Sequence, residues 1–165
     1  MTPFTLIHVL LSLVGILTGL VVLAGLLSAK RLDSWTLVFL ASTLATSLTG
    51  FGFPFERLLP SHIIGAISVV VLGAAIYSRY VRLMERRWRS IYVVAAVVAL
   101  YLNVFVLVVQ LFLNVPALNA LAPTQSEPPF AVAQLVVLVV FAGLGVAAVK
   151  RFRVGTAPER LVSSL

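Results

Sequence analysis

The chain alternates between long uncharged apolar stretches and short segments that hold its charged residues. The apolar stretches run over residues 4–29, 34–55, 61–78, 90–115 and 130–149. Each is long enough to cross about 30 Å of hydrocarbon as a helix that rises about 1.5 Å per residue. Helices are required because lipid offers no partner for unpaired backbone groups, and the stretches lack the alternation of a barrel strand. The pattern predicts an all-α integral membrane protein, a five-transmembrane-helix bundle in which residues 1–165 form a single transmembrane domain.

The composition excludes a soluble fold. Of the 165 residues, 61% are hydrophobic and only 10% are charged, and the mean hydropathy is +1.14. A water-soluble domain needs far more polar surface than this. The net charge of +7 comes from basic residues that separate the apolar stretches instead of forming a basic domain, so we expect no nucleic-acid partner. Cysteine is absent from the sequence, which excludes a thiolate metal site and a cysteine nucleophile.

The basic residues predict the orientation of the spans. Eleven of the 12 Lys and Arg residues lie on the side that is reached after the first span, and only Arg57 lies on the other side. The positive-inside rule therefore predicts the N-terminus outside and the C-terminus in the cytoplasm. The same basic residues would attract anionic lipid, although topology alone explains them. The lipid bilayer is the first predicted partner.

Charged groups are missing from the centres of the spans. All five acidic residues lie in loops or at helix ends, and no Lys or Arg lies at a span centre. Proton relays and voltage sensors use charged groups at depth, so this pattern weighs against an ion-coupled pump. The sequence also lacks the G-x-S-x-G and H-E-x-x-H motifs of hydrolases. These observations favour a protein that is not an enzyme.

The two histidines lie on the same predicted side of the membrane. His8 lies about one turn into the first span, and His62 opens the third span. Stripes of small residues continue the line of each histidine, namely Ser12, Gly15 and Gly19 after His8, and Gly65 and Gly73 after His62. Such stripes let helices pack closely, and they can also leave room for a flat cofactor. One hypothesis is therefore a b-type haem or quinone redox subunit, with His8 and His62 as axial ligands and Arg57 as the partner of a propionate.

Two other interpretations of the histidines stay open. They can act as interfacial anchors or hydrogen-bond partners with no ligand. They can also form a periplasm-facing divalent metal site with an acid of the outer loops, because imidazole and carboxylate groups suit a transition ion. The acids available for such a site are Glu56 and Glu127.

Amide side chains form a second group of candidate site residues. Asn103, Gln110 and Asn114 follow one another at spacings of seven and four, on one face of the fourth span. Gln134 enters the fifth span at a depth comparable with Gln110. This polar cluster either converges with the histidines or forms interhelical hydrogen bonds. The second span carries hydroxyl side chains that can bond back to the preceding turn and need no ligand, namely Ser42, Thr43, Thr46, Ser47 and Thr49.

These features predict a membrane protein whose activity the sequence does not assign. The leading hypothesis is an accessory or packing subunit, or a small-ligand binding module, with any site towards the outer leaflet. Its partner would be another membrane protein or a second copy of the chain. In the outer loop over residues 116–129, Pro128 and Pro129 predict the first turn of the last span, and the role of this loop stays open.

Three segments carry a resemblance to other proteins. Residues 49–55 (TGFGFPF), 102–110 (LNVFVLVVQ) and 121–130 (LAPTQSEPPF) resemble segments of a group of bacterial multi-pass membrane proteins with no assigned activity. The resemblance extends over most of the chain. It implies a location in the bacterial inner (plasma) membrane, and it assigns no catalytic residue to this chain.

Overall fold

The regular structure of the chain is helical. The computed structural model describes residues 2–52 and 60–152, with 60–62 described by their backbone alone. Within these ranges the elements are, in order, α1 (Pro3–Leu27), α2 (Asp33–Gly50), α3 (Pro60–Ile76), the short π-helix η1 (Tyr77–Val81), α4 (Arg87–Asn114), α5 (Pro116–Leu121) and α6 (Pro128–Arg151). The all-α fold class predicted from the hydrophobic pattern is confirmed.

Several of these helices are suited to cross a membrane. By length and composition, four stretches in the described residues qualify, namely Pro3–Leu27, Ile63–Val81, Arg87–Asn114 and Pro128–Arg151. The predicted second span is not among them. Its helix α2 has 18 residues, is rich in Ser and Thr, and ends at Gly50, short of the predicted end at residue 55. The predicted count of five spans is therefore not confirmed by these criteria.

Proline and a left-handed residue set several helix boundaries. Pro3, Pro116 and Pro128 begin α1, α5 and α6, at the position where a missing N–H group removes no helical hydrogen bond. The prediction that Pro128 and Pro129 form the first turn of the last long helix is confirmed. After the end of α1, Ala29 has a φ of 56°, and the Lys30 N–H donates to the Gly25 carbonyl at 2.8 Å. This bond satisfies a carbonyl of the last turn and turns the chain into α2.

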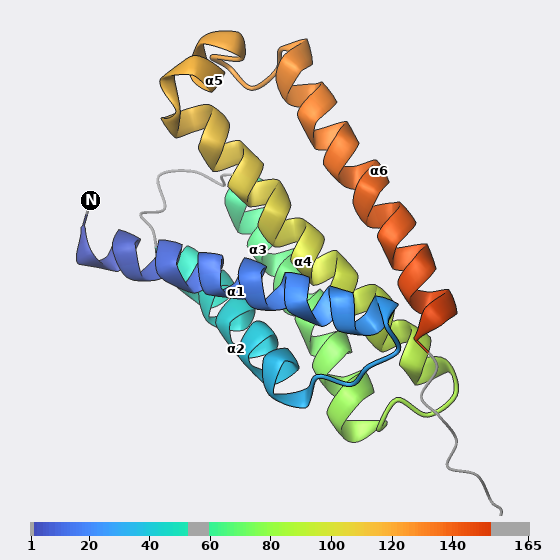
Figure 1. Ribbon diagram of the computed structural model, residues 1–165. Coiled ribbons are helices and arrows are strands. Elements are labelled where there is room, and N and C mark those ends of the chain that lie inside the picture. Colours follow the sequence, from blue (N-terminus) through green and yellow to red (C-terminus); the bar gives the residue numbers. More distant parts are fainter. Residues whose placement is uncertain (1, 53–59, 153–165) are drawn as a thin grey trace, which may run out of the picture.

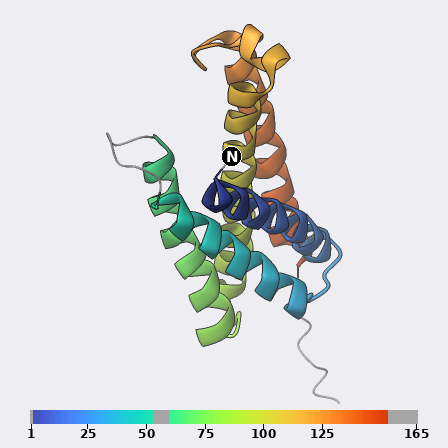
Figure 2. The ribbon, with the colours of Figure 1, turned by 90° about the vertical axis from the view of Figure 1, so that its left-hand side faces the viewer.

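Helix α4 lies at the centre of the bundle and contacts α1, α3, α5 and α6. Its first half carries most of its buried residues, from Tyr92 to Asn103, and beyond Asn103 only Phe112 of this helix is buried. Figures 1 and 2 show α4 and α6 side by side, joined through α5, with their upper parts rising beyond α1, α2 and α3. The core therefore occupies the lower part of the bundle in these views.

Two glycines of α1 allow this helix to approach its neighbours closely. A Cβ atom at Gly19 would lie 2.6 Å from Cδ1 of Leu100 and 2.8 Å from Cε2 of Phe39. A Cβ atom at Gly15 would lie 3.0 Å from Oγ1 of Thr43. The Gly15 to Gly19 pair thus packs α1 against α2 and α4, which is the usual role of a GxxxG motif in membranes.

The two ends of the bundle differ in charge. Every Lys and Arg of residues 2–52 and 60–152 lies at one end, which we call the basic end. It comprises the α1–α2 loop, η1 with the loop to α4, the first turn of α4, and the last turn of α6. The opposite end, called the far end below, holds the starts of α1, α3 and α6 together with α5.

Candidate functional site

His8, the first candidate ligand, is held against α2. Its Nδ1 atom lies 2.9 Å from Oγ1 of Thr49. The Thr49 hydroxyl donates to the Ala45 carbonyl at 2.8 Å, so it accepts a hydrogen bond from the imidazole. Along the same helix, the predicted room for a flat cofactor at Gly15 and Gly19 is filled by side chains of α2 and α4.

The other residues of the haem hypothesis are not described. The His62 backbone lies in the first turn of α3, but its side chain is outside the described residues, as is all of Arg57. The structure therefore does not test whether two imidazoles meet. The haem ligation stays a prediction.

The proposed metal site is not assembled by the described residues. Glu127 precedes α6, which begins beside α5, and Figures 1 and 2 show this region well away from the start of α1 that carries His8. Among residues 2–52 and 60–152, no group of three or more His, Cys, Asp or Glu side chains could hold a metal ion. Glu56 lies outside the described residues.

The Glu127 carboxylate is engaged within its own loop. It accepts hydrogen bonds from the Thr124 hydroxyl at 2.8 Å and from the backbone N–H groups of Thr124 and Ser126 at 3.2 and 3.1 Å. Desolvation raises the pKa of Glu127, but these hydrogen bonds lower it by more, so the pKa of this carboxyl group lies below its ordinary value. The charged form of Glu127 therefore orders the loop that leads into α6.

The four amide side chains have separate partners. Asn103 is buried and donates across helices to Oγ1 of Thr43 at 3.1 Å. Gln110 and Asn114 are exposed and bond to each other at 3.1 Å, one turn apart on α4. Gln134 donates to the Phe105 carbonyl of α4 at 3.2 Å. Oε1 of Gln134 is buried without a hydrogen-bond partner. The four side chains lie at separate positions along α4 and the start of α6, and they do not converge on a common point.

The most extensive side-chain network that the structure describes lies at the basic end. It centres on Arg79, which is only 4% exposed although it lies in η1 at the end of a candidate membrane-spanning segment. Its guanidinium forms an ion pair with Asp33 in the first turn of α2. Asp33 also lies 3.5 Å from the Arg31 guanidinium, while 68% of its own side chain stays exposed. This ion pair joins two segments that are far apart in the sequence.

Aromatic and sulfur groups complete the surroundings of Arg79. The guanidinium carbon lies 5.0 Å from the ring centroid of Tyr92 and 5.7 Å from that of Tyr80, within the range of cation–π attraction. Its Nη1 atom lies 3.9 Å from Sδ of Met84. A buried charge is tolerated only when it is paired in this way, so the residues around Arg79 act as a unit.

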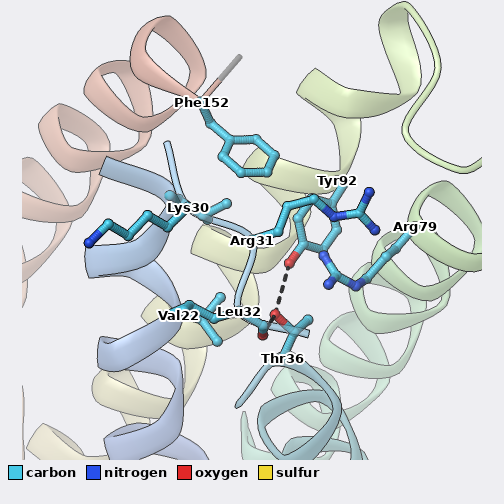
Figure 3. Close-up of a pocket in the computed structure, with 9 residues that line it drawn as sticks. Val22, Lys30, Arg31, Leu32, Thr36, Arg79, Tyr92 and Phe152 are labelled. Carbon is cyan, nitrogen blue, oxygen red and sulfur yellow. Dashed lines mark hydrogen bonds between the residues drawn. The ribbon is translucent and has the colours of Figure 1, made fainter. Parts of the chain in front are cut away.

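Tyr92 connects this ion pair to the remaining helices. It is fully buried on α4, and its hydroxyl donates to Oγ1 of Thr36 on α2 at 3.5 Å (Figure 3). Its ring lies 6.5 Å from that of Phe152, the buried residue that follows α6. We call the set Asp33, Thr36, Arg79, Tyr92 and Phe152 the arginine junction.

A second arginine holds the end of α6 beside the arginine junction. Arg89 on α4 donates from Nη1 to the Phe152 carbonyl, and to the Val149 carbonyl at 3.3 Å. These are carbonyls at the C-terminus of α6, where a positive charge is also favoured by the helix dipole. Helices α4 and α6 are therefore joined at the basic end by charge as well as by packing.

The arginine junction is closed. The nine residues that surround its central space come from α1, α2, η1, α4 and the residue after α6, as well as the α1–α2 loop, and they leave no room for a water molecule. In Figure 3 the Arg79 guanidinium lies beside Tyr92, whereas Lys30 points away from it. With its charges paired and its space filled, this arrangement can fix helices against one another, and it offers no position for a substrate.

Sequence reasoning placed Arg79 only among the residues that set topology. The signal that would have identified it is its register on the third span. Ser68, Leu72, Ala75 and Arg79 follow at spacings of four, three and four, and all four are buried. An arginine in line with the buried face of a helix must find a partner inside the protein.

The chain was also compared with known proteins. The comparisons with protein-family models, curated proteins and solved structures find no match. The resemblance to bacterial multi-pass membrane proteins therefore stays a prediction.

Proposed function

We propose that this chain is a non-enzymatic, five-span accessory subunit of the bacterial inner membrane, which packs against another membrane protein. In this proposal the basic end faces the cytoplasm, and α2 crosses the membrane as the second of the five spans. With 18 residues, α2 would rise about 27 Å, which is close to the roughly 30 Å thickness of the hydrocarbon core. The ion pair of Asp33 with Arg79 supports this topology because it sets the start of α2 level with the end of α3.

The main support for the proposal comes from the far half of the α4–α6 hairpin, that is, the second half of α4, the short helix α5 and the first half of α6. Only Phe141 and Ala148 of α6 are buried, whereas Val132, Val136 and Val139 are 58%, 56% and 62% exposed. This part of the hairpin rises beyond α1, α2 and α3 (Figures 1 and 2). These exposed apolar side chains on a two-helix projection support a role in packing against other helices of the membrane.

The amide side chains support the same interpretation. Gln110 and Asn114 are exposed near the far end of α4 and bond only to their own helix. Polar side chains that face lipid gain more when they can hydrogen-bond across to another helix. A partner helix on this side would give the two amides such contacts.

Photo-crosslinking in native membranes tests the proposed packing. A photoreactive residue at Val136 or Val139 should give an adduct of one discrete mass, and Val70 of α3 is the matched control because it is 72% exposed. A second copy of the chain would appear as a dimer, and another subunit as a different mass. Absence of a discrete adduct at Val136 and Val139, or the same adduct at Val70, would contradict the proposal.

The proposed orientation has its own test. Alkaline phosphatase is active only outside the cytoplasm, so a fusion after Lys150 should be inactive. Activity of this fusion would overturn the assignment of the basic end to the cytoplasm.

A further inference from the structure

An apolar groove lies between α4 and α6 near the basic end. Its volume is about 210 Å³, and it is lined by Val94, Gly145, Val146, Val149 and Lys150. Val94 and Val146 are 49% and 56% exposed, so the groove opens on the outer surface of the bundle. Because both helices are candidate membrane spans, this surface faces lipid acyl chains when the protein is embedded.

Glycine shapes the groove. A Cβ atom at Gly145 would lie 3.5 Å from Cγ1 of Val97, which is an ordinary van der Waals contact. The backbone at Gly145 therefore lies close to α4 but leaves room for a Cβ atom. The absence of a side chain at this position leaves space between the two helices. A large residue at Gly145 would fill the groove without a clash of its Cβ atom.

The mouth of the groove is positively charged. Lys150 lines its basic end and is exposed. Arg87 precedes Val94 by seven residues, which places it on the same face of α4, two turns nearer the basic end. Neither α4 nor α6 contains an acidic residue, and the acid nearest to Arg87 in the sequence, Glu85, lies in the loop before α4.

We propose that this groove binds one anionic phospholipid, with an acyl chain along Val94, Gly145 and Val146 and the phosphate between Arg87 and Lys150. The groove provides the apolar contact, and the two cations provide the charge that an anionic headgroup needs at the membrane surface. This site is distinct from the far half of the hairpin that we propose for a protein partner, so either proposal can fail without the other.

Native mass spectrometry of the full chain in detergent tests the proposal directly. The protein is titrated with dioleoyl phosphatidylglycerol and, separately, with dioleoyl phosphatidylcholine, and the bound lipids are counted. We expect one phosphatidylglycerol to bind more tightly than phosphatidylcholine. Replacement of each cation, in Arg87→Gln and Lys150→Gln, should weaken phosphatidylglycerol binding about fivefold.

Matched variants separate this site from a general attraction to the basic end. Lys150→Arg keeps the charge and should retain binding, and Arg151→Gln removes a cation that does not line the groove and should also retain it. Gly145→Leu fills the groove and should lose the tight phosphatidylglycerol, whereas Gly143→Leu, at a position with nothing within 4 Å, should keep it. If Gly145→Leu does not fold, Arg87→Gln and Lys150→Gln still test the proposal.

Three results would overturn the proposal. The first is equal affinity for phosphatidylglycerol and phosphatidylcholine. The second is an equal loss of binding in Arg151→Gln and Lys150→Gln, which would show that the attraction is spread over the whole basic end. The third is a dimer whose formation is blocked by Gly145→Leu, because a second copy of the chain would then occupy the groove.

Discussion

The basic end and the far end of the bundle hold their helices in different ways. At the basic end, side chains join segments that are distant in the sequence, as in the Asp33–Arg79 ion pair, the Tyr92–Thr36 hydrogen bond and the bonds of Arg89 to the end of α6. At the far end, the bonds of Gln110, Asn114, Thr124 and Glu127 stay within one helix or one loop. The exceptions include the bonds of His8 to Thr49, of Gln125 to the Val109 carbonyl and of Gln134 to the Phe105 carbonyl, and each is a single bond between neighbouring elements.

This difference shows that a residue can set topology and packing at once. Arg79 belongs to the basic residues that the positive-inside rule explains, yet it is buried and paired. The far end carries the polar residues that stand out against apolar spans, but its described side chains contact fewer distant elements. We therefore expect substitutions at the arginine junction to cost more stability than substitutions of the candidate site residues.

The largest expected effect is that of Asp33→Asn. It leaves the buried guanidinium of Arg79 without its counter-charge, although the Tyr92 and Tyr80 rings remain beside it. Because Asp33 is largely exposed, we expect a loss of about 3 kcal/mol, the low end for a broken buried pair. The measurement is the free energy of unfolding in mixed micelles. Glu85→Gln removes an exposed acid at the same end and should change it little.

The next largest effect is expected where α1 crosses α2 and α4. In Gly19→Ala the new methyl group meets Leu100 and Phe39, both buried, at 2.6 and 2.8 Å. Gly143→Ala adds the same methyl group where nothing lies within 4 Å. The unfolding free energies of the two variants should differ by about 1–3 kcal/mol, with Gly19→Ala the less stable. Equal stabilities would mean that α1 does not pack as closely as described.

Asn103→Leu should have a smaller effect. It removes the hydrogen bond to Thr43 while it keeps a side chain of similar size, and such bonds in membranes average about 0.6 kcal/mol. Asn114→Leu removes a bond that lies within α4, so its unfolding free energy should stay close to that of the unchanged protein. A larger loss of unfolding free energy in Asn114→Leu than in Asn103→Leu would contradict the description of Asn103 as the amide that joins two helices and of Asn114 as the amide that bonds within one helix.

The smallest expected effect is a pH dependence at the far end. The folded state lowers the pKa of Glu127 from its ordinary value of about 4.5. Its contribution to stability is therefore fully present above that value and is lost as the pH falls through the lower folded value. Hydrogen exchange of the loop before α6 should therefore accelerate in this acidic range. In Glu127→Gln this pH dependence should disappear, and an unchanged acidic acceleration would show that another group causes it.

The sequence predicts the elements of this fold better than their ends. Apolar length predicted the long helices, and Pro128 correctly predicted the first turn of α6. Four of the five hydroxyls singled out in the second span bond back to their own helix as predicted, for example Ser47 to the Thr43 carbonyl, whereas the Thr43 hydroxyl accepts a hydrogen bond from Asn103. Helix α5 was missed because residues 116–121 form a helix too short to produce a periodic pattern.

The network at the basic end was harder to predict because it depends on tertiary contacts. The π-helix at Tyr77–Val81 has no sequence signature of its own, and it is the element that carries Arg79 to Asp33. The candidate residues His8, Asn103 and Gln134 were identified by their polarity, but polarity does not say which partner each one meets. Their bonds to Thr49, Thr43 and the Phe105 carbonyl follow from helix register and crossing, which one sequence does not determine.

A double-mutant cycle on Asp33 and Arg79 tests the central claim most directly. The unfolding free energies of Asp33→Asn, Arg79→Leu and the double variant are measured in the same micelles. If the pair joins α2 to η1 as described, the effects are not additive, and the interaction energy should be at least about 1 kcal/mol. Additivity within about 0.5 kcal/mol would show that the two residues act independently, and it would contradict the arginine junction as the feature that holds the basic end together.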